Sequence, residues 1–555
     1  MVANEKWFGA SGDFYPETIN QSVRFNGSSS QLNITPSSTG NRKTFTTSLW
    51  VKRSKISSSM EFHTGGSNSY NTQSTQFGIN SSDQLQFYDV LAGITNYAYV
   101  RSDNLLRDTS NWYHIVLAVD TTQSTASDRV KLYINGSEVT YVSSPTYPSQ
   151  DHQTVRNNSG TLTRIGRFPN VAVNFFSGYI AEFNHIDGTA LTPSSFGELK
   201  NSVWTPKSLS SLTYGTNGFR LTFADSSNLG DDTSGNGNDF TSSGLSASGP
   251  VTDSPTNNFS TLNSIGNDTE VTFSEGNLKV SVPQNINATP RCEGTFAVSS
   301  SKWYWEVNII SIDSGSSTPM IGIKDLTISG HESQIFSGAS VYGYYANSGN
   351  KYNSGNLGSY GATYTAGDII GVALDLDAGT LTFYKNNSSQ GTAFSSLSGE
   401  YTIHFGTGYY AYTAVVNFGQ DGTFAGNETA QGNTDANGVG DFYYSPPSGH
   451  LALCSSNLPD TTISPSKSTQ ADDHFDTILR VGHGSSGGST PANFKADWIW
   501  EKVRNSSYSH YLIDSSRGIV DGSTQVLITN TTNLETTGNW YKPPTSSSLE
   551  FNTND

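Results

Sequence analysis

Charged residues are scarce in this sequence. Only 14% of its 555 residues are Asp, Glu, Lys or Arg, against about 25% in an average soluble domain. Basic residues are the rarer kind, with 30 Lys and Arg against 47 Asp and Glu, and the formal net charge is −17. Because a phosphate backbone requires a basic footprint on its partner, we expect no nucleic-acid ligand.

Disulfides, membrane spans and a signal peptide are also not indicated. Cysteine occurs only at Cys292 and Cys454, which predicts two reduced, buried thiols rather than a disulfide framework. No run of 18 apolar residues occurs, so no membrane span is expected. The first residues do not show the charged-then-apolar pattern of a signal peptide. We therefore expect the chain to be made and assembled in a cytoplasm.

Gly, Ser, Thr, Asn and aromatic residues take the place of the missing charges. The chain has 54 Gly, and 12% of its residues are aromatic. Ser, Thr, Asn and Gly are poor helix formers, whereas Thr, Tyr, Phe and Val favour strands. The length allows about three domains. The composition predicts an all-β protein built from many short strands and turns.

Strand-like runs separated by turn residues fill positions 22–199. Asn135 and Gly136 follow one such run and predict a hairpin, because a type I′ turn needs positive φ at both central residues. The succession "FTTSLWVKR", "NWYHIVLAVD", "VKLYINGSEV", "TRIGR" and "FSGYIAEFNHIDGTAL" resembles the laminin-G-like, concanavalin-A-like jelly roll. This resemblance implies an antiparallel two-sheet β-sandwich.

A stretch rich in Gly, Asn, Ser and Pro follows at 200–266. We expect an ordered, β-rich connector here, because its large apolar residues need to be buried. These residues are Phe219, Leu221, Phe223, Phe240 and Phe259.

A second set of strand-like runs fills positions 267–455. The segments "SKWYWEV", "IGI", "GDIIGVALDLDAGTLTFYKNN", "GTAF" and "VVNFGQ" occur in this order. The succession resembles a SPRY domain, which implies a second antiparallel β-sandwich with a binding role.

The end of the chain is divided into a linker at 456–471 and a small β-rich module at 472–555. The module resembles the opening of one that often follows these two domain types in phage proteins, and further strands would be expected after it. A domain of this size is marginal alone. Fibre proteins compensate for such marginal stability by closed assembly, most often with cyclic symmetry. We therefore expect a homo-oligomer, and specifically a trimer.

The order of segments resembles virion proteins of marine tailed phages. The segments that carry this resemblance include "WFGASGDFYPETINQSVRFNG", "IDGTALTPSSFGE", "LGDDTSGNGNDF" and "GDFYYSPPSGHLALCSSNLP". It implies a tail fibre or appendage on the virion surface, with other virion proteins and host surface glycans or proteins as partners. A purely structural head or tail decoration or connector is the alternative. Residues 1–21 are predicted to be the attachment segment, because Trp7, Phe8, Phe14 and Tyr15 have no evident strand partners.

Catalysis is not expected. Retaining glycosidases use two carboxylates about 5 Å apart, but Glu182 and Glu306 each stand alone in a strand-like run and are expected on its wet face. Asp375 and Asp377 flank a hairpin, where Asp forms turns. His114 is expected to be an ordinary strand residue. A glycan hydrolase is thus only a remote alternative.

Two groups of residues are candidates for binding. Asp231, Asp232 and Asp239 lie around Gly and Asn residues and could bind Ca²⁺, although such residues also make tight turns; no other cofactor is expected. The second group is a set of tyrosines expected in loops, where they would form a ligand-binding surface or pack against neighbouring subunits. These are Tyr344, Tyr345, Tyr352, Tyr409 and Tyr410.

Overall fold

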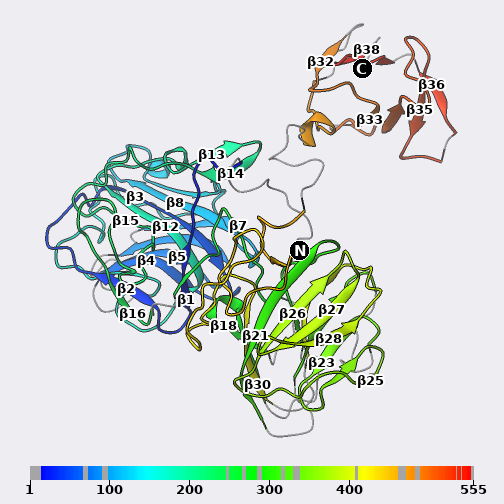
Figure 1. Ribbon diagram of the computed structural model, residues 1–555. Helices are drawn as coiled ribbons and strands as arrows, with labels where there is room; N and C mark the ends of the chain where they lie inside the picture. Colours follow the sequence, from blue (N-terminus) through cyan, green and yellow to red (C-terminus); the bar gives the residue numbers. More distant parts are fainter. Residues whose placement is uncertain are drawn as a thin grey trace. The chain divides into compact units, whose positions relative to one another are not determined.

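The computed structural model is nearly all-β (Figure 1). It describes residues 14–66, 73–90, 98–245, 249–265, 271–283, 291–313, 319–328, 338–406, 411–459, 471–481, 488–504, 506–532, 534–538 and 541–551. The chain divides into two compact units, Met1–Asp460 and Thr461–Asp555. Single-turn 3₁₀ helices lie at Ala126–Asp128, Pro193–Ser195, Glu275–Asn277 and Ala471–Asp473. The predicted all-β class is confirmed.

Two sheets form the first sandwich. One has the order β10 (Ser137–Glu138), β9 (Val130–Ile134), β8 (Tyr113–Asp120), β3 (Thr44–Arg53), β12 (Ser177–Asp187), β1 (Ser22–Asn26) and β17 (Pro250–Val251), with β15 (Phe219–Leu221) also paired to β12. The other has the order β16 (Thr241–Ser243), β2 (Gln31–Ile34), β11 (Thr163–Ile165), β4 (Met60–Gly66), β5 (Ser74–Ile79), β6 (Gln84–Val90) and β7 (Ala98–Leu105). A hairpin of β13 (Gly197–Lys200) and β14 (Val203–Pro206) stands apart from both.

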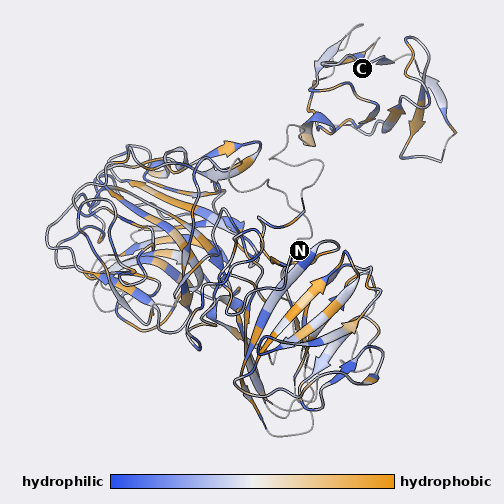
Figure 2. Ribbon diagram, viewed as in Figure 1, coloured by the Kyte–Doolittle hydropathy of each residue, from blue (hydrophilic) through white to orange (hydrophobic). Residues whose placement is uncertain are grey.

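Alternation along each strand sorts the side chains of this sandwich. In β3, Phe45, Leu49 and Val51 belong to the core between the sheets, whereas Trp50 packs in a separate cluster on the outer face. Successive residues of a strand point to opposite faces, so this follows from the pleat. Figure 2 shows hydrophobic stretches along the strands of both sandwiches.

The predicted hairpin after β9 is present. Asn135 and Gly136 have φ of 48° and 82°, as a type I′ turn requires. A Cβ on Gly136 would also lie 2.4 Å from the Trp204 ring. Glycine is therefore needed here for both backbone conformation and space.

The connector at 200–266 contributes strands to the first sandwich. Within it, β15 and β17 extend one sheet and β16 extends the other. Phe219, Leu221, Phe223 and Phe240 are buried in the same core. The expectation that these residues need burial is confirmed, and the connector is an integral part of the sandwich.

The second sandwich also has two sheets. The first has the order β18 (Thr272–Ser274), β19 (Lys279–Val282), β30 (Tyr412–Asn417), β21 (Lys302–Ile312), β26 (Ile369–Asp375), β27 (Thr380–Lys385) and β28 (Ser388–Phe394), and β31 (Leu451–Ala452) runs parallel to β21. The second has the order β20 (Arg291–Glu293), β29 (Tyr401–Gly406), β22 (Met320–Asp325), β23 (Val341–Tyr345), β24 (Asn350–Tyr352) and β25 (Asn356–Ser359). Cys292 and Cys454 are buried and free, as predicted, and burial raises the pKa of the Cys454 thiol to about 12.

A buried lysine joins the first sandwich to the segment that leads into the second. The Lys52 ammonium, on the outer face of β3, contacts Asp253 Oδ2 at 2.8 Å, Asn258 Oδ1 at 2.7 Å and the Phe259 carbonyl at 2.7 Å. Trp112 donates its indole N–H to the other Asp253 oxygen. Burial lowers the pKa of Lys52 and raises that of Asp253. Both charges depend on this pairing, because a buried charge without a partner is costly.

A second group of contacts links the two sandwiches directly. Arg24 of β1 forms ion pairs with Asp421 and Glu275, at 3% side-chain exposure for Arg24. The Tyr179 hydroxyl donates to the Gly276 carbonyl at 2.8 Å. Gly276 has φ of +66°, and a Cβ there would lie 2.4 Å from the Tyr179 ring. The sandwiches therefore meet through buried polar contacts.

The C-terminal unit holds two small sheets. One has the order β32 (Ser489–Pro491), β38 (Ser548–Phe551) and β37 (Tyr541–Lys542), and the other has the order β33 (Trp498–Glu501), β34 (Tyr511–Asp514), β35 (Thr524–Ile528) and β36 (Thr536–Gly538). The fully buried apolar side chains of its core cluster are Ile513, Val526, Tyr541 and Phe551. The predicted small β-rich module is confirmed, and most of the predicted linker lies outside the described residues.

Candidate functional site

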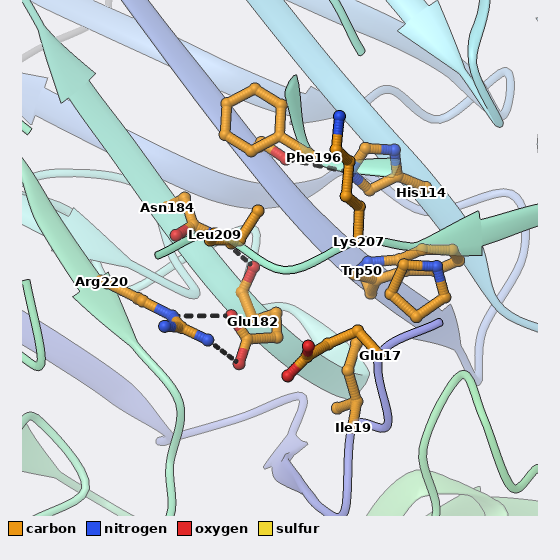
Figure 3. Close-up of a pocket in the computed structure, with 12 residues that line it drawn as sticks. Glu17, Ile19, Trp50, His114, Glu182, Asn184, Phe196, Lys207, Leu209 and Arg220 are labelled. Carbon is orange, nitrogen blue, oxygen red and sulfur yellow. Dashed lines mark hydrogen bonds and ion pairs between the residues drawn. The ribbon is translucent and has the colours of Figure 1, made fainter. Parts of the chain in front are cut away.

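The outer face of β3, β8 and β12 carries a small cavity with both polar and apolar lining (Figure 3). Three strands supply its floor, and the segments before β1 and after β14 close over it. The lining residues are Glu17, Ile19, Ser48, Trp50, His114, Glu182, Asn184, Phe196, Pro206, Lys207, Leu209 and Arg220. It brings together carboxylate, guanidinium, imidazole and indole groups.

Glu182 and Arg220 form the charged centre of this cavity. The Arg220 Nε and Nη2 atoms donate to the two Glu182 oxygens, each at 3.0 Å. Glu182 has φ of 46° within a bulge of β12, and the neighbouring strand β15 places Arg220 opposite Asn184, two residues further along β12. Burial lowers the pKa of Arg220, but the hydrogen bonds and charge of Glu182 raise it by more. The expected wet-face position of Glu182 was wrong, since its side chain is only 14% exposed.

Both ring nitrogens of His114 are within hydrogen-bond distance of a partner. Trp204 donates its indole N–H to His114 Nδ1 at 2.9 Å, and His114 Nε2 lies 2.9 Å from the Ser48 hydroxyl. Since Nδ1 accepts, the ring proton is assigned to Nε2. Burial lowers the pKa of His114 to about 3. The imidazole is therefore a neutral, structural group with no free lone pair for proton transfer.

The cavity is small for a ligand. It offers about 10 Å³ to the centre of a water molecule, which is room for about one water. A sugar ring would have to displace the covering segment that carries Glu17 and Ile19. The cavity thus has room for a water-sized group beside an ion pair. No local signal in the sequence pointed to Arg220, which lies 38 residues from Glu182.

The covering segment is part of the predicted N-terminal attachment segment. Phe14 is 3% exposed and Ile19 is 6% exposed, and Thr256 exchanges hydrogen bonds with the backbone of Ile19. Phe14 was singled out for having no evident strand partner, but its ring is buried, with the Lys200 ammonium 5.3 Å from the ring centroid. Trp7 and Phe8 lie outside the described residues.

Glu306 in the second sandwich is also a correction to the sequence prediction. It was expected on a wet strand face but has 0% exposure. The segment after β30 covers that face, and Tyr443 and Tyr444 donate their backbone N–H groups to the two Glu306 oxygens at 2.9 Å and 2.7 Å. Burial raises the pKa of Glu306 to about 7. The carboxylate anchors the covering segment to β21.

Asp375 and Asp377 lie at the hairpin between β26 and β27, as expected. Asp375 pairs with Lys302 at 2.8 Å and accepts the Ala378 N–H, and Asp377 accepts the Ser301 N–H. Both carboxylates thus serve the turn and its neighbours.

Three of the candidate ligand-binding tyrosines lie in strands of the part of the chain that the structure describes. Tyr344 and Tyr345 belong to β23 and are 0% and 6% exposed, so the expectation that they lie in loops was wrong. Tyr344 packs between Tyr360, Tyr364 and Phe383 in the core. Tyr352 is half-buried in β24, and Tyr409 and Tyr410 lie outside the described residues.

In the turn that contains Asp231, Asp232 and Asp239, carboxylates accept hydrogen bonds from backbone N–H groups. Asp232 accepts N–H groups from Arg220, Ser234 and Asn238, and Asp239 accepts the Asp232 N–H. Within the described ranges no cluster of three His, Cys, Asp or Glu side chains is placed to hold a metal. The Ca²⁺ site with Asp231 stays a prediction. The same ranges contain no helix long and apolar enough to cross a membrane.

Comparison with known proteins identifies three domain families along the chain. The concanavalin A-like lectin/glucanases superfamily matches residues 26–195, the SPRY domain matches 302–421, and a domain of unknown function (DUF7483) matches 470–549. A Ran-binding proteins 9/10 homolog of Drosophila melanogaster is 35% identical over 81 residues, which are 14% of this chain. Those residues span only 8% of that relative.

Some solved structures are similar to parts of the chain. The SPRY domain of human HERC1 is 20% identical and covers 27% of this chain and 96% of its own, with a TM-score of 0.24. A heptameric SAP-like pentraxin from Limulus polyphemus is 17% identical and covers 31% of this chain and 78% of its own, also with a TM-score of 0.24. Both family resemblances drawn from the sequence are confirmed by the family matches: the chain contains a laminin-G-like, concanavalin-A-like domain followed by a SPRY domain.

Proposed function

We propose that this chain is a non-catalytic binding protein of a tailed-phage particle, a fibre or appendage that binds glycans on the host surface. The observation that carries the proposal is the joining of a lectin-type sandwich to a SPRY sandwich through buried ion pairs. Such a connection fixes two binding folds in one geometry. The order of sequence segments shared with phage virion proteins supports the location on a particle.

The surroundings of the two strand carboxylates support a role without catalysis. Glu182 is bound by Arg220 through two hydrogen bonds, and Glu306 is bound by two backbone N–H groups of a covering segment. They belong to different sandwiches. A retaining hydrolase needs two carboxylates about 5 Å apart, one of them free to act as nucleophile.

A glycan array with the whole chain tests the ligand class. We expect retention on polysaccharides from the host envelope, and no release of reducing ends when the same polysaccharides are incubated with the protein. Release of reducing ends would instead establish the hydrolase alternative. Immunogold labelling of particles tests the location, and we expect label at the tail.

One observation favours the second candidate, a structural decoration or connector protein. Tyr344, which was expected in a ligand-binding surface, is buried in the SPRY core, and Tyr345 is buried in a separate small cluster with Met320 and Val341. Under this alternative the array shows no retention and the label lies on the head or along the tail tube. Both experiments therefore separate the two functions.

A further inference from the structure

Exposed apolar side chains concentrate in the C-terminal unit. Of the sixteen large apolar residues that are exposed in the described ranges, nine lie after residue 460, although that unit is the smaller of the two. The nine are Phe475, Leu479, Val481, Trp498, Trp500, Val503, Tyr508, Val520 and Leu534. Such a concentration marks an interaction surface, because monomeric proteins seldom leave large apolar patches in water.

Two of these residues stand together on one sheet face. Trp498 and Trp500 alternate along β33 and are 52% and 50% exposed, while Ile499 between them packs toward the core. Residues i and i+2 of a strand share a face. Each indole thus has about half of its surface in water.

The apolar surface continues across the neighbouring strands. Trp500 pairs with Leu512 of β34, and Leu512 pairs with Leu527 of β35. Cross-strand partners lie on the same side of a sheet. We call the surface formed by Trp498, Trp500, Leu512 and Leu527 the tryptophan face.

Among the described residues, the neighbours of the tryptophan face carry little net charge. Around it, Trp500 donates its indole N–H to the Thr529 hydroxyl and meets the His510 ring edge-on. Gln525 and Thr537 form the next pair across the sheet. Asp514, the partner of Trp498, is neutralised by Arg517 at 3.1 Å. Two copies can therefore bring these faces together without the repulsion that a net charge of −17 causes elsewhere.

The C-terminal unit as a whole exposes a large apolar surface, of which the tryptophan face is one part. If a large side chain offers roughly 150–250 Å², the nine exposed residues of the unit, which include Trp498 and Trp500, together leave on the order of 1,000 Å² in water. A stable interface takes about 800 Å² from each partner. The unit also has a small core cluster of four fully buried apolar residues, so it gains stability from burial between chains.

We propose that the tryptophan face binds a second copy of this chain, so that the C-terminal module is the assembly element of a closed homo-oligomer. Trp498 and Trp500 form the centre of the interface, with the polar groups around them as its rim. Central tryptophans of this kind dominate binding in protein interfaces. The inference concerns assembly and holds or fails independently of glycan binding.

Sedimentation of the full chain over a wide concentration range tests the proposal. The wild-type chain is expected to form a discrete oligomer, and the double variant Trp498→Ser, Trp500→Ser is expected to raise the dissociation constant by roughly a hundredfold or more. The matched control is Leu199→Ser, which replaces an exposed apolar residue (69%) on the β13 hairpin of the other unit. This control should assemble like the wild type.

Footprinting of the unaltered chain provides a second test that needs no variant. The extent of hydroxyl-radical labelling at Trp498 and Trp500, measured by mass spectrometry, should decrease when the protein is concentrated. It should increase again on dilution. A wild-type chain that stays monomeric at every concentration overturns the proposal. An oligomer in which both tryptophans remain fully labelled overturns it as well.

Discussion

The two compact units of this protein differ in the side chains that they bury and expose. The larger unit encloses charge: Lys52, Arg24 and Glu306 are almost completely buried, each with fixed partners. The smaller unit leaves Trp498 and Val481 in water, at 52% and 89% exposure. Buried polar contacts specify one arrangement of neighbouring parts, whereas exposed apolar surface calls for a partner. The first unit thus pairs these buried charged groups within itself, whereas the second exposes the surface that we propose binds a second copy of the chain.

The largest effect is expected from Lys52→Met. The change leaves Asp253 buried without its cation, which should lower the free energy of unfolding by about 3–5 kcal/mol. Denaturant titration of the full chain measures this loss, and adding Asp253→Asn should recover part of it. Lys43→Met is the matched control, because Lys43 pairs with Asp151 at the surface and such pairs contribute about 0–1 kcal/mol. Equal losses for Lys52 and Lys43 would show that burial is not the cause.

A pH-dependent effect is expected at Glu306. Burial raises its pKa to about 7, so the folded chain keeps a proton that the unfolded chain gives up near pH 4.5. Its contribution to stability is fully present below that pH and is lost as pH rises through about 7. Relative to Glu306→Gln, the wild type should therefore lose up to roughly 3 kcal/mol between these limits.

Urea unfolding of the wild type and Glu306→Gln over this pH range measures the difference. Taking the difference removes the contributions of other titrating groups. His114 is one of these groups, and its contribution to stability is lost in acid. Glu198→Gln, at an exposed position of β13, is the control and should show no such slope. A constant difference between wild type and Glu306→Gln would mean that Glu306 is ionised throughout.

A smaller effect is expected from Gly276→Ala at the contact between the sandwiches. The new methyl group would meet the Tyr179 ring and force a side chain into φ of +66°, at a cost of about 1–3 kcal/mol. Gly235→Ala separates the two causes, because Gly235 also has positive φ but nothing within 4 Å of its Cβ position. Thermal unfolding should show the larger loss for Gly276→Ala. Similar losses would indicate that backbone strain alone is responsible.

The smallest effect is expected at an exposed position of the C-terminal unit, and a substitution in the core of the same unit provides the contrast. Leu534 is 90% exposed, so Leu534→Ser should change the free energy of unfolding by no more than about 0.5 kcal/mol. Phe551→Ala, in the small core, should cost about 3–5 kcal/mol. Chemical unfolding of the full chain, with limited proteolysis as the readout of the C-terminal unit, measures the losses caused by both substitutions. A large loss from Leu534→Ser would show that this residue is covered in solution.

Pattern and turn chemistry predicted most of the fold but little of the candidate site. The Asn135 and Gly136 hairpin and both sandwich types followed from short segments of sequence. Glu182 and Glu306 were placed on wet strand faces by the same alternation rule. Both placements were wrong. The alternation rule describes the two faces of one strand, but it does not predict whether a distant segment of the chain covers a face.

The sequence by itself determined the strand-rich class, the two domain types and the reduced cysteines. These depend on composition, on alternation within a few residues and on turns of two or three residues. Only the tertiary structure decided which polar groups are buried and with which partner. Lys52 and Asp253 are 201 residues apart, and Glu306 and Tyr444 are 138 apart. Such pairs form because folding brings distant segments together in a low-dielectric interior, where an unpaired charge would be too costly to keep.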